Sequence, residues 1–357
     1  MTASSVTNST NGTLPRIAVT MGDVAGIGPE IIARSFAKPE FRSQFFPVVV
    51  GDPDVLERAA QLVGYRFDIR EIGSLDEFSP TPDDVENSVI WCWNPTQADT
   101  ADVPPGRIDG RAGKAAYDWL VAATQAALAG TVDGIVTAPI SKAALHAGGH
   151  DYPGHTEILA EQCGVDDFAM MLYLPLCSVI KGPYGLSVAH VTLHTSIASV
   201  PGLLSQQGIQ EKIQLMNHFL RRIGCPEPRI GVCALNPHAG EEGLFGDEES
   251  RIIAPAVMES RQNSIAAEGP FPADTLLQRA VHGAFDGVIA MYHDQGHIAL
   301  KLIAFQKAVN VTLGLPIVRT SPSHGTGFDI SWRGMADDGG LQEATRVAIE
   351  LCRRRSL

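Results

Sequence analysis

Three histidines stand where apolar, strand-like runs of the sequence end. His194 closes the run AHVTLHTS, His238 lies in CALNPHAGE, and His293 follows the run IAMY. Residues that follow neighbouring parallel strands converge on a common cleft at one edge of a sheet. Three neutral imidazoles suit a borderline divalent ion and leave positions open for substrate oxygens. Any one of them is more often a satisfied core or loop histidine, so a metal site and three structural histidines are equally good interpretations of the pattern alone.

A second group of side chains could bind a small polar ligand. His155 and Thr156 follow directly after a Pro-Gly turn and offer hydrogen bonds. Glu157 comes next, and it is at least as well explained as the first acidic residue of a capped helix.

Lys301, Asn310 and Arg319 supply the positive charge and the amide donors that hold a phosphate or a carboxylate. Lysines and arginines are often only solvated. Lys301 differs because it lies inside the apolar run IALKLIAF, where a lone charge needs a partner. Together these residues indicate an enzyme with an anionic substrate.

A glycine-rich turn follows the first strand-like run. Residues 16–20 (RIAVT) lead into MGDVAGIGPEII, which contains Gly26 and Gly28 before a helical pattern. A turn of this kind can present backbone N–H groups to an anion or a cofactor, and it can equally be a tight connection without a ligand. The dinucleotide fingerprint GxGxxG is absent, which counts against an ordinary Rossmann domain.

The elements that must position these residues alternate between strand and helix. The alternation predicts an α/β architecture with a largely parallel sheet. Helical patterns occupy residues 54–64 and 110–130. The predicted strands lie at 16–20, 47–52, 88–93, 133–142, 170–174, 186–193, 229–235, 286–292 and 308–313.

Composition sets limits on partners and location. A chain of 357 residues is longer than one core usually supports, so we expect two domains. The formal net charge of −13 argues against a nucleic-acid surface. Six scattered cysteines without CxxC pairs fit reduced thiols in the cytosol, and no apolar run approaches the ~20 residues that span a bilayer. The Ser/Thr/Asn-rich residues 1–14 predict a disordered tail.

The motifs in their order resemble the 4-hydroxythreonine-4-phosphate dehydrogenase family of vitamin B6 (pyridoxine) synthesis. The resemblance runs from about Arg16 to Arg354. The motifs that carry it are MGDVAGIGPE, TAPISK, GHTE, NPHAGE, PADTL, YHDQG, VNVTLGLP and HGTGFDI. That family is related to the isocitrate and isopropylmalate dehydrogenases, whose cofactor fold is not of the Rossmann type.

The resemblance implies two α/β/α domains with an active-site cleft between them. We expect residues 15–135 and 313–357 to form the cofactor domain. Residues 136–312 would carry the metal, the substrate and the contact of an obligate homodimer, with histidines from both subunits on one ion.

The resemblance also assigns residues to roles. Metal ligands would be His194, His238 and His293, with zinc as the leading ion and magnesium, manganese or cobalt as alternatives. The phosphorylated substrate would contact His155, Thr156, Lys301, Asn310 and Arg319.

The cofactor implied by the resemblance is NAD. The glycine turn with Gly26 and Gly28 and the loop with His324, Gly325 and Thr326 would hold it. Asp329 would accept hydrogen bonds from ribose hydroxyls, and its charge would repel the 2′-phosphate of NADP.

The implied reaction oxidises the secondary alcohol of 4-phosphooxy-L-threonine and releases carbon dioxide, giving 3-amino-2-oxopropyl phosphate. A metal would polarise the hydroxyl oxygen. Lys301 is a candidate proton relay, although phosphate binding explains it as well, and Asp274 and Asp294 are further catalytic candidates.

Two segments depart from the family pattern. Residues 321–323 read SPS, and residues 331–338 read SWRGMADD. Both lie in or beside the expected cofactor loop. They therefore bear on the contacts to the adenosine end of the cofactor. The family that the chain resembles also contains paralogues acting on four-carbon sugar-acid phosphates, so threonate or erythronate 4-phosphate is an alternative substrate. A phosphate-binding acyltransferase and a catalytically inactive ligand-binding paralogue remain alternatives of other classes.

Overall fold

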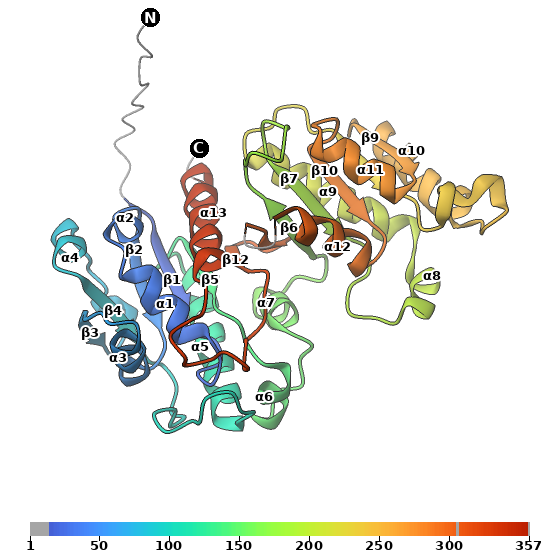
Figure 1. The fold of residues 1–357 in the computed structure, drawn as a ribbon. Coiled ribbons are helices and arrows are strands. Elements are labelled where there is room, and N and C mark those ends of the chain that lie inside the picture. The colour runs from blue at the N-terminus through green and yellow to red at the C-terminus, as the bar shows by residue number, and fades with distance from the viewer. Residues whose placement is uncertain (1–13, 305–306, 356–357) are drawn as a thin grey trace, which may run out of the picture.

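The computed structural model describes residues 14–304 and 307–355. The tail that the sequence predicts at residues 1–14 lies outside this part of the chain, apart from Leu14. The described residues fold into helices around one large mixed sheet (Figure 1). The strands are β1 (Arg16–Thr20), β2 (Phe46–Val50), β3 (Asp68–Ile72), β4 (Val89–Trp93), β5 (Gly134–Thr137), β6 (Ala169–Leu174), β7 (Leu186–His190), β8 (Ile230–Cys233), β9 (Ala267–Phe271), β10 (Gly287–Ala290), β11 (Val309–Leu313) and β12 (Val318–Pro322).

Helices cover the sheet on both sides, as expected for an α/β architecture with buried parallel strands. They are α1 (Gly28–Phe36), α2 (Pro39–Arg42), α3 (Pro53–Leu62), α4 (Pro82–Glu86), α5 (Gly110–Leu128), α6 (Lys142–Ala147), α7 (His155–Cys163), α8 (Val200–Leu203), α9 (Gln206–Arg222), α10 (Ala254–Gln262), α11 (Ala273–Val281), α12 (His293–Ala304) and α13 (Gly339–Arg355). None in the described part is long and apolar enough to cross a bilayer.

The strand order is β3-β4-β2-β1-β5-β12-β11-β6-β7-β10-β8-β9. Most neighbours are parallel, but β12–β11, β11–β6 and β6–β7 pair antiparallel at the centre. The sequence predicts a largely parallel sheet, which agrees with most of the strand pairs. It does not predict the antiparallel pairs at the centre. Strands β3, β9 and β12 are also absent from the sequence-based list.

The chain crosses between the two halves of the sheet at the centre. Strands β3, β4, β2, β1, β5 and β12 form one half, and the remaining strands form the other. Helices α6 and α7 pack against α5 of the first half, although the sequence assigns residues 136–312 to the second domain (Figure 1). Strand β12 returns late in the chain to pair with β5, and α13 packs on it.

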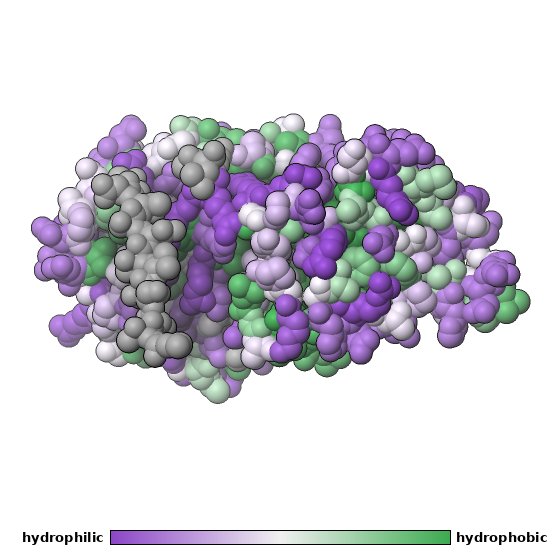
Figure 2. Space-filling view, turned by 90° about the horizontal axis from the view of Figure 1, so that it is seen from above, coloured by the Kyte–Doolittle hydropathy of each residue, from purple (hydrophilic) through white to green (hydrophobic). Residues whose placement is uncertain are grey.

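The strand β1 shows why these runs fold as they do. Ile17, Ala18 and Val19 are fully buried between β2 and β5. Burying side chains of this kind stabilises the fold by roughly 1.5–3 kcal/mol for each large aliphatic residue. The surface is different: seen from above, hydrophilic and hydrophobic residues are mixed over the exposed face (Figure 2).

Candidate active site

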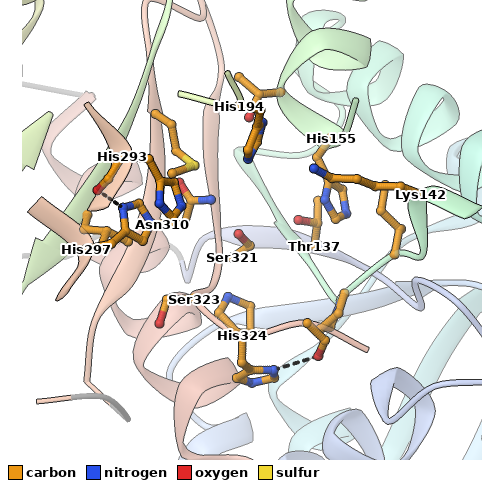
Figure 3. Close-up of a pocket in the computed structure, with 18 of the residues that line it drawn as sticks. Thr137, Lys142, His155, His194, His293, His297, Asn310, Ser321, Ser323 and His324 are labelled. Carbon is orange, nitrogen blue, oxygen red and sulfur yellow. Dashed lines mark hydrogen bonds between the residues drawn. The ribbon is translucent and has the colours of Figure 1, made fainter. Parts of the chain in front are cut away.

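A cavity of about 240 Å³ lies where the two halves of the sheet meet. The first half contributes Thr137 at the end of β5, the starts of α6 and α7, and β12; the second half contributes β11, α12 and the loop after β7. Figure 3 shows His155 and Lys142 on one side of an open centre and His293 and His297 on the other. The cavity therefore occupies the cleft between the halves.

Most of the sequence-predicted site residues line this one cavity. They come from segments that are far apart in the chain, and strand ends bring several of them together. They are His155, Thr156, His194, His293, Lys301, Asn310, Arg319, His324 and Gly325.

Arg319 is the largest charged side chain of the cavity wall and is only 1% exposed. Its guanidinium donates to Thr137 Oγ1 at 2.7 Å and to Thr312 Oγ1 at 3.0 Å, while its Nε has no partner among the described residues. Burial lowers the pKa of Arg319, and the nearby Glu157 carboxylate opposes that shift. A buried cation without an ion pair is a strong site for an anion.

Buried polar atoms without partners cluster in the same cavity. Each such atom costs free energy unless a ligand or water completes its hydrogen bonds. Within the described residues they include His155 Nε2, Glu157 Oε2, Asn310 Oδ1, Arg319 Nε and His324 Nε2.

His155 and Glu157 begin helix α7, but neither serves as a cap in the described structure. The N-cap is Gly154, and no side chain caps it. Burial, with the Arg319 charge beside it, holds the pKa of His155 well below its usual value, so the imidazole is neutral at pH 7. The side chain of Glu157 therefore does not cap the helix. Glu157 lines the cavity, and its Oε2 has no hydrogen-bond partner among the described residues.

His194 and His293 approach each other at one end of the cavity, with ring centroids 6.0 Å apart. Burial lowers the pKa of His194, and Lys142 adds to this effect, so its ring offers a lone pair at neutral pH. Nδ1 of His293 lies 2.6 Å from Asp294 Oδ1, which leaves Nε2 of His293 for a ligand. A carboxylate on the second nitrogen of an imidazole is the usual support of a metal-binding histidine.

His238 does not join the other two histidines in this chain. It lies exposed on the loop 237–243, where residues 238–242 all have positive φ. Its ring packs near exposed Phe245, at 6.5 Å between centroids. Within the described residues, no group of three or more His, Cys, Asp or Glu side chains could hold an ion. One chain thus offers two of the three predicted ligands.

A second hollow of about 390 Å³ shares His194 and His293 with the cavity. Leu193, Ile197 and Tyr292 line it on one side, and Asp294 lies at its edge. The two histidines therefore form the partition between the cavity and a second, open hollow of mixed polar and apolar lining.

A pair of buried histidines that the sequence interpretation did not include lies behind His293. His297 stacks on His293, with centroids 3.7 Å apart and planes 12° apart, and its Nδ1 lies 3.2 Å from Nε2 of His190. Burial lowers the pKa of His297 to about 2 and that of His190 to about 4, so both rings are neutral. His297 lines the cavity and His190 does not.

The glycine turn uses its donors inside the protein. The N–H groups of Ala25, Gly26 and Ile27 donate to Asp23 Oδ1, to the Asp23 carbonyl and to the Thr326 carbonyl. A Cβ on Gly28 would lie 2.3 Å from the Met21 carbonyl oxygen, so glycine is required there for close packing. The turn is thus hydrogen-bonded to the loop of Thr326, through the N–H of Ile27 and the Thr326 carbonyl.

The expected cofactor loop lies at the rim of the cavity. His324 and Gly325 line it, and the unpartnered Nε2 of His324 leaves room for a ligand group. Asp329 is exposed. Both departing segments are ordered here: Ser321, Pro322 and Ser323 line the cavity, whereas Trp332 does not.

Trp332 has φ 59°, a left-handed conformation that is unusual for a bulky residue. Its Nε1 donates to the Val24 carbonyl at 2.8 Å, and the Arg58 guanidinium lies 4.2 Å from the ring centroid. The departing segment is thereby fixed to the loop before α1.

Asp274 lies outside both hollows. It is exposed at the start of α11, where Oδ1 accepts from the Thr275 N–H at 2.8 Å. Several residues that line the cavity are not assigned a role from the sequence. Thr137 and Lys142 belong to TAPISK, and His297 follows His293 at helical spacing, so both signals were present.

The chain matches a known protein family over most of its length. Residues 43–348 match the family model described as "Pyridoxal phosphate biosynthetic protein PdxA". The chain belongs to this family. It is therefore related to the dehydrogenases whose motifs the sequence resembles.

Individual PdxA relatives carry two different names. A protein of Beijerinckia indica named 4-hydroxythreonine-4-phosphate dehydrogenase is 46% identical over 337 residues, which cover 94% of this chain and 94% of the relative. A protein of Cupriavidus necator named D-threonate 4-phosphate dehydrogenase is 43% identical over 348 residues, covering 96% and 99%. Relatives with either name therefore have nearly the same sequence identity to this chain.

The solved structures include a 4-hydroxythreonine-4-phosphate dehydrogenase from Klebsiella pneumoniae. It is 42% identical, has a TM-score of 0.82, and the match covers 95% of this chain and 99% of that one. The α/β fold that the resemblance implies is confirmed, with a large mixed sheet like that expected for this family.

Proposed function

We propose that this protein is an NAD-dependent dehydrogenase that oxidises and decarboxylates 4-phosphooxy-L-threonine in pyridoxal phosphate synthesis. The observation that carries the proposal is the cavity in which Arg319, Lys301 and Asn310 face His194 and His293. It joins an anion site to a pair of imidazoles. The relatives named for D-threonate 4-phosphate keep that acid as a second candidate at the same site.

The phosphate belongs at the end of the cavity formed by Arg319. Its Nε is unpartnered, and His155 Nε2 and Asn310 Oδ1 also lack partners within the described chain. Thr156 and Lys301 line the same wall. A phosphate dianion would accept from the donor groups of this set and offset the cost of burying the guanidinium.

His194 and His293 fit a divalent metal in their donor chemistry, with Asp294 supporting His293. Zinc is the leading ion, and magnesium, manganese and cobalt are alternatives. When bound, the ion would polarise the hydroxyl oxygen of the substrate. In this chain His194 and His293 are the ligands, and a third ligand must come from elsewhere.

A second copy of the chain would supply that ligand as His238. The loop of His238 carries Leu244, 73% exposed, and Phe245, 49% exposed. The hollow beside His194 and His293 is lined by both apolar and polar side chains, and Ile197 at its wall is 66% exposed. Exposed apolar side chains on the loop and at the wall of the hollow suit a symmetric homodimer with one metal at each contact.

NAD would lie between the cavity and the loop of His324. When bound, it accepts a hydride from the third carbon of the substrate. His324 Nε2 and Gly325 would border it, and Asp329 would accept from a ribose hydroxyl and disfavour NADP. The turn of Gly26 and Gly28 would act by holding the Thr326 backbone rather than by donating to phosphate.

The chain's own groups complete the reaction. Oxidation moves a hydride from the third carbon to NAD and the hydroxyl proton to a base, and the resulting β-keto acid loses carbon dioxide. Lys301 is the proton-relay candidate that the cavity favours, because Asp274 lies outside it and Asp294 is engaged with His293.

The test is a substrate panel with purified protein, NAD and each of zinc, manganese and magnesium. We expect NADH formation with 4-phosphooxy-L-threonine or D-threonate 4-phosphate and none with the dephosphorylated acids. Absence of NADH with every phosphorylated acid and metal would leave an acyltransferase or a non-catalytic binding protein as the function.

A further inference from the structure

His190 and His297 form a buried pair for which the proposed function gives no role. His190 is 1% exposed and His297 is 6% exposed. Nδ1 of His297 lies 3.2 Å from Nε2 of His190, and Nδ1 of His190 faces the Met170 carbonyl at 3.4 Å. The pair thus connects the cavity wall to the backbone of β6.

The hydrogen bonds fix which nitrogen of His297 carries the proton. Nδ1 of His297 also lies 3.2 Å from the His293 carbonyl oxygen, drawn as a dashed line in Figure 3. A carbonyl oxygen only accepts, so Nδ1 of His297 must donate. In the tautomer with its proton on Nδ1, the Nε2 of His297 holds a lone pair and accepts a hydrogen bond.

Nε2 is the ring nitrogen that His297 has available for a ligand in the substrate cavity. His297 lines the cavity, and no hydrogen bond of its Nε2 to the described residues is present. His293, His297 and Lys301 follow one another at successive turns of α12, and all three line the cavity. His297 therefore lies between the imidazole that would bind the metal and the lysine near the phosphate.

We propose that His297 is a specificity-determining residue whose Nε2 accepts a hydrogen bond from the substituent on the second carbon of the substrate. This inference rests on the proposed function. The phosphate dianion and the carboxylate of the substrate only accept, and the hydroxyl of the third carbon gives up its proton during oxidation. The hydroxyl or ammonium group on the second carbon is the remaining donor, and an acceptor-only nitrogen matches it.

The experiment compares each acid with an analogue that lacks the substituent on the second carbon. The measured quantity is the ratio of kcat/KM for the complete acid to kcat/KM for the 2-deoxy acid 4-phosphate. We expect His297→Leu to reduce this ratio about tenfold, as loss of one hydrogen bond does. His297→Gln, which can place an amide oxygen near the position of Nε2, should restore part of the ratio.

His190→Leu is the matched control. It removes the hydrogen-bond partner of His297 that lies outside the cavity. It should therefore change kcat/KM for both acids by the same factor. Running the panel with the hydroxy acid and the amino acid distinguishes the two possible donors, since the larger ratio in the wild type identifies the group that His297 binds.

Two outcomes are distinguishable. If the wild type oxidises the complete acid and His297→Leu lowers kcat/KM for both acids equally, His297 is only a packing residue and the inference is wrong. If the wild type oxidises none of the acids with NAD, the proposed function itself fails.

Discussion

The imidazole rings of His194 and His293 lie with centroids 6.0 Å apart across the partition between two hollows. The loop after β7 delivers one ring and the start of α12 delivers the other. No third ligand from the described residues of the same chain completes the pair. In the proposed function the two rings would be two ligands of a metal site that a second subunit completes.

Subunit complementation tests that arrangement. His293→Ala and His238→Ala should each abolish metal binding and turnover. When the two variants are mixed and allowed to exchange subunits, each mixed dimer regains one intact site. A 1:1 mixture should recover about a quarter of wild-type activity, because half of the dimers are mixed. Recovery of nothing, with exchange shown by mass spectrometry, would mean that the three histidines do not share an ion across subunits.

Replacing Arg319 should separate binding from stability. Arg319→Met removes the buried guanidinium, so we expect KM for the phosphorylated acid to rise about 10- to 100-fold. The unliganded protein should be as stable as the wild type or more stable, because a buried charge without an ion pair is costly. Steady-state kinetics and thermal melts check both parts. An unchanged KM together with a lower Tm would show that Arg319 serves the fold alone.

Asp294→Asn tests the support of His293. The carboxylate lies 2.6 Å from Nδ1 of His293 and orients that ring. Loss of its charge should weaken zinc affinity about 10- to 100-fold, measured by competition with a chelator. Asp76→Asn makes the same charge change at an exposed position of the first half and should leave the affinity as it is. Equal zinc affinities in the two variants would show that Asp294 does not support metal binding by His293.

Asp23 predicts a pH-dependent stability effect. Burial raises the pKa of this carboxyl group from 3.8 to about 6, so its ionised form is disfavoured in the folded protein. The stability that the protonated group contributes is fully present below about pH 4 and is lost as the pH rises through 6.

Asp23→Asn should consequently stabilise the protein by about 3 kcal/mol at pH 8 and by roughly half as much at pH 5. Denaturant melts at the two pH values measure this difference. A gain that is larger at pH 5 than at pH 8 would contradict the assigned pKa.

Much of the site could be predicted because its residues terminate recognisable runs. His293 follows the apolar, β-branched segment of β10, Asn310 lies inside that of β11, and Lys301 is conspicuous within an apolar helix. The spacing of His297 from His293 equally predicts a shared helical face, but a histidine at that position has no chemistry until its partner His190 is known.

Other features depend on contacts that no local pattern contains. Strand β12 carries a buried arginine, which hides its strand character, and the edge strand β3 is largely exposed. β9 contains Gly-Pro, which usually argues against a strand. The separation of His238 from its expected partners reflects a site that one chain does not complete.

The most direct test of the account follows carbon and hydride together. Purified protein with NAD and zinc receives 4-phosphooxy-L-threonine or D-threonate 4-phosphate labelled in the carboxyl carbon, and released carbon dioxide is measured beside NADH. We predict equal amounts of the two products from at least one acid, and neither product from the Arg319→Met and His293→Ala double variant. NADH without carbon dioxide, or equal products from that variant, would contradict the proposed reaction at this site.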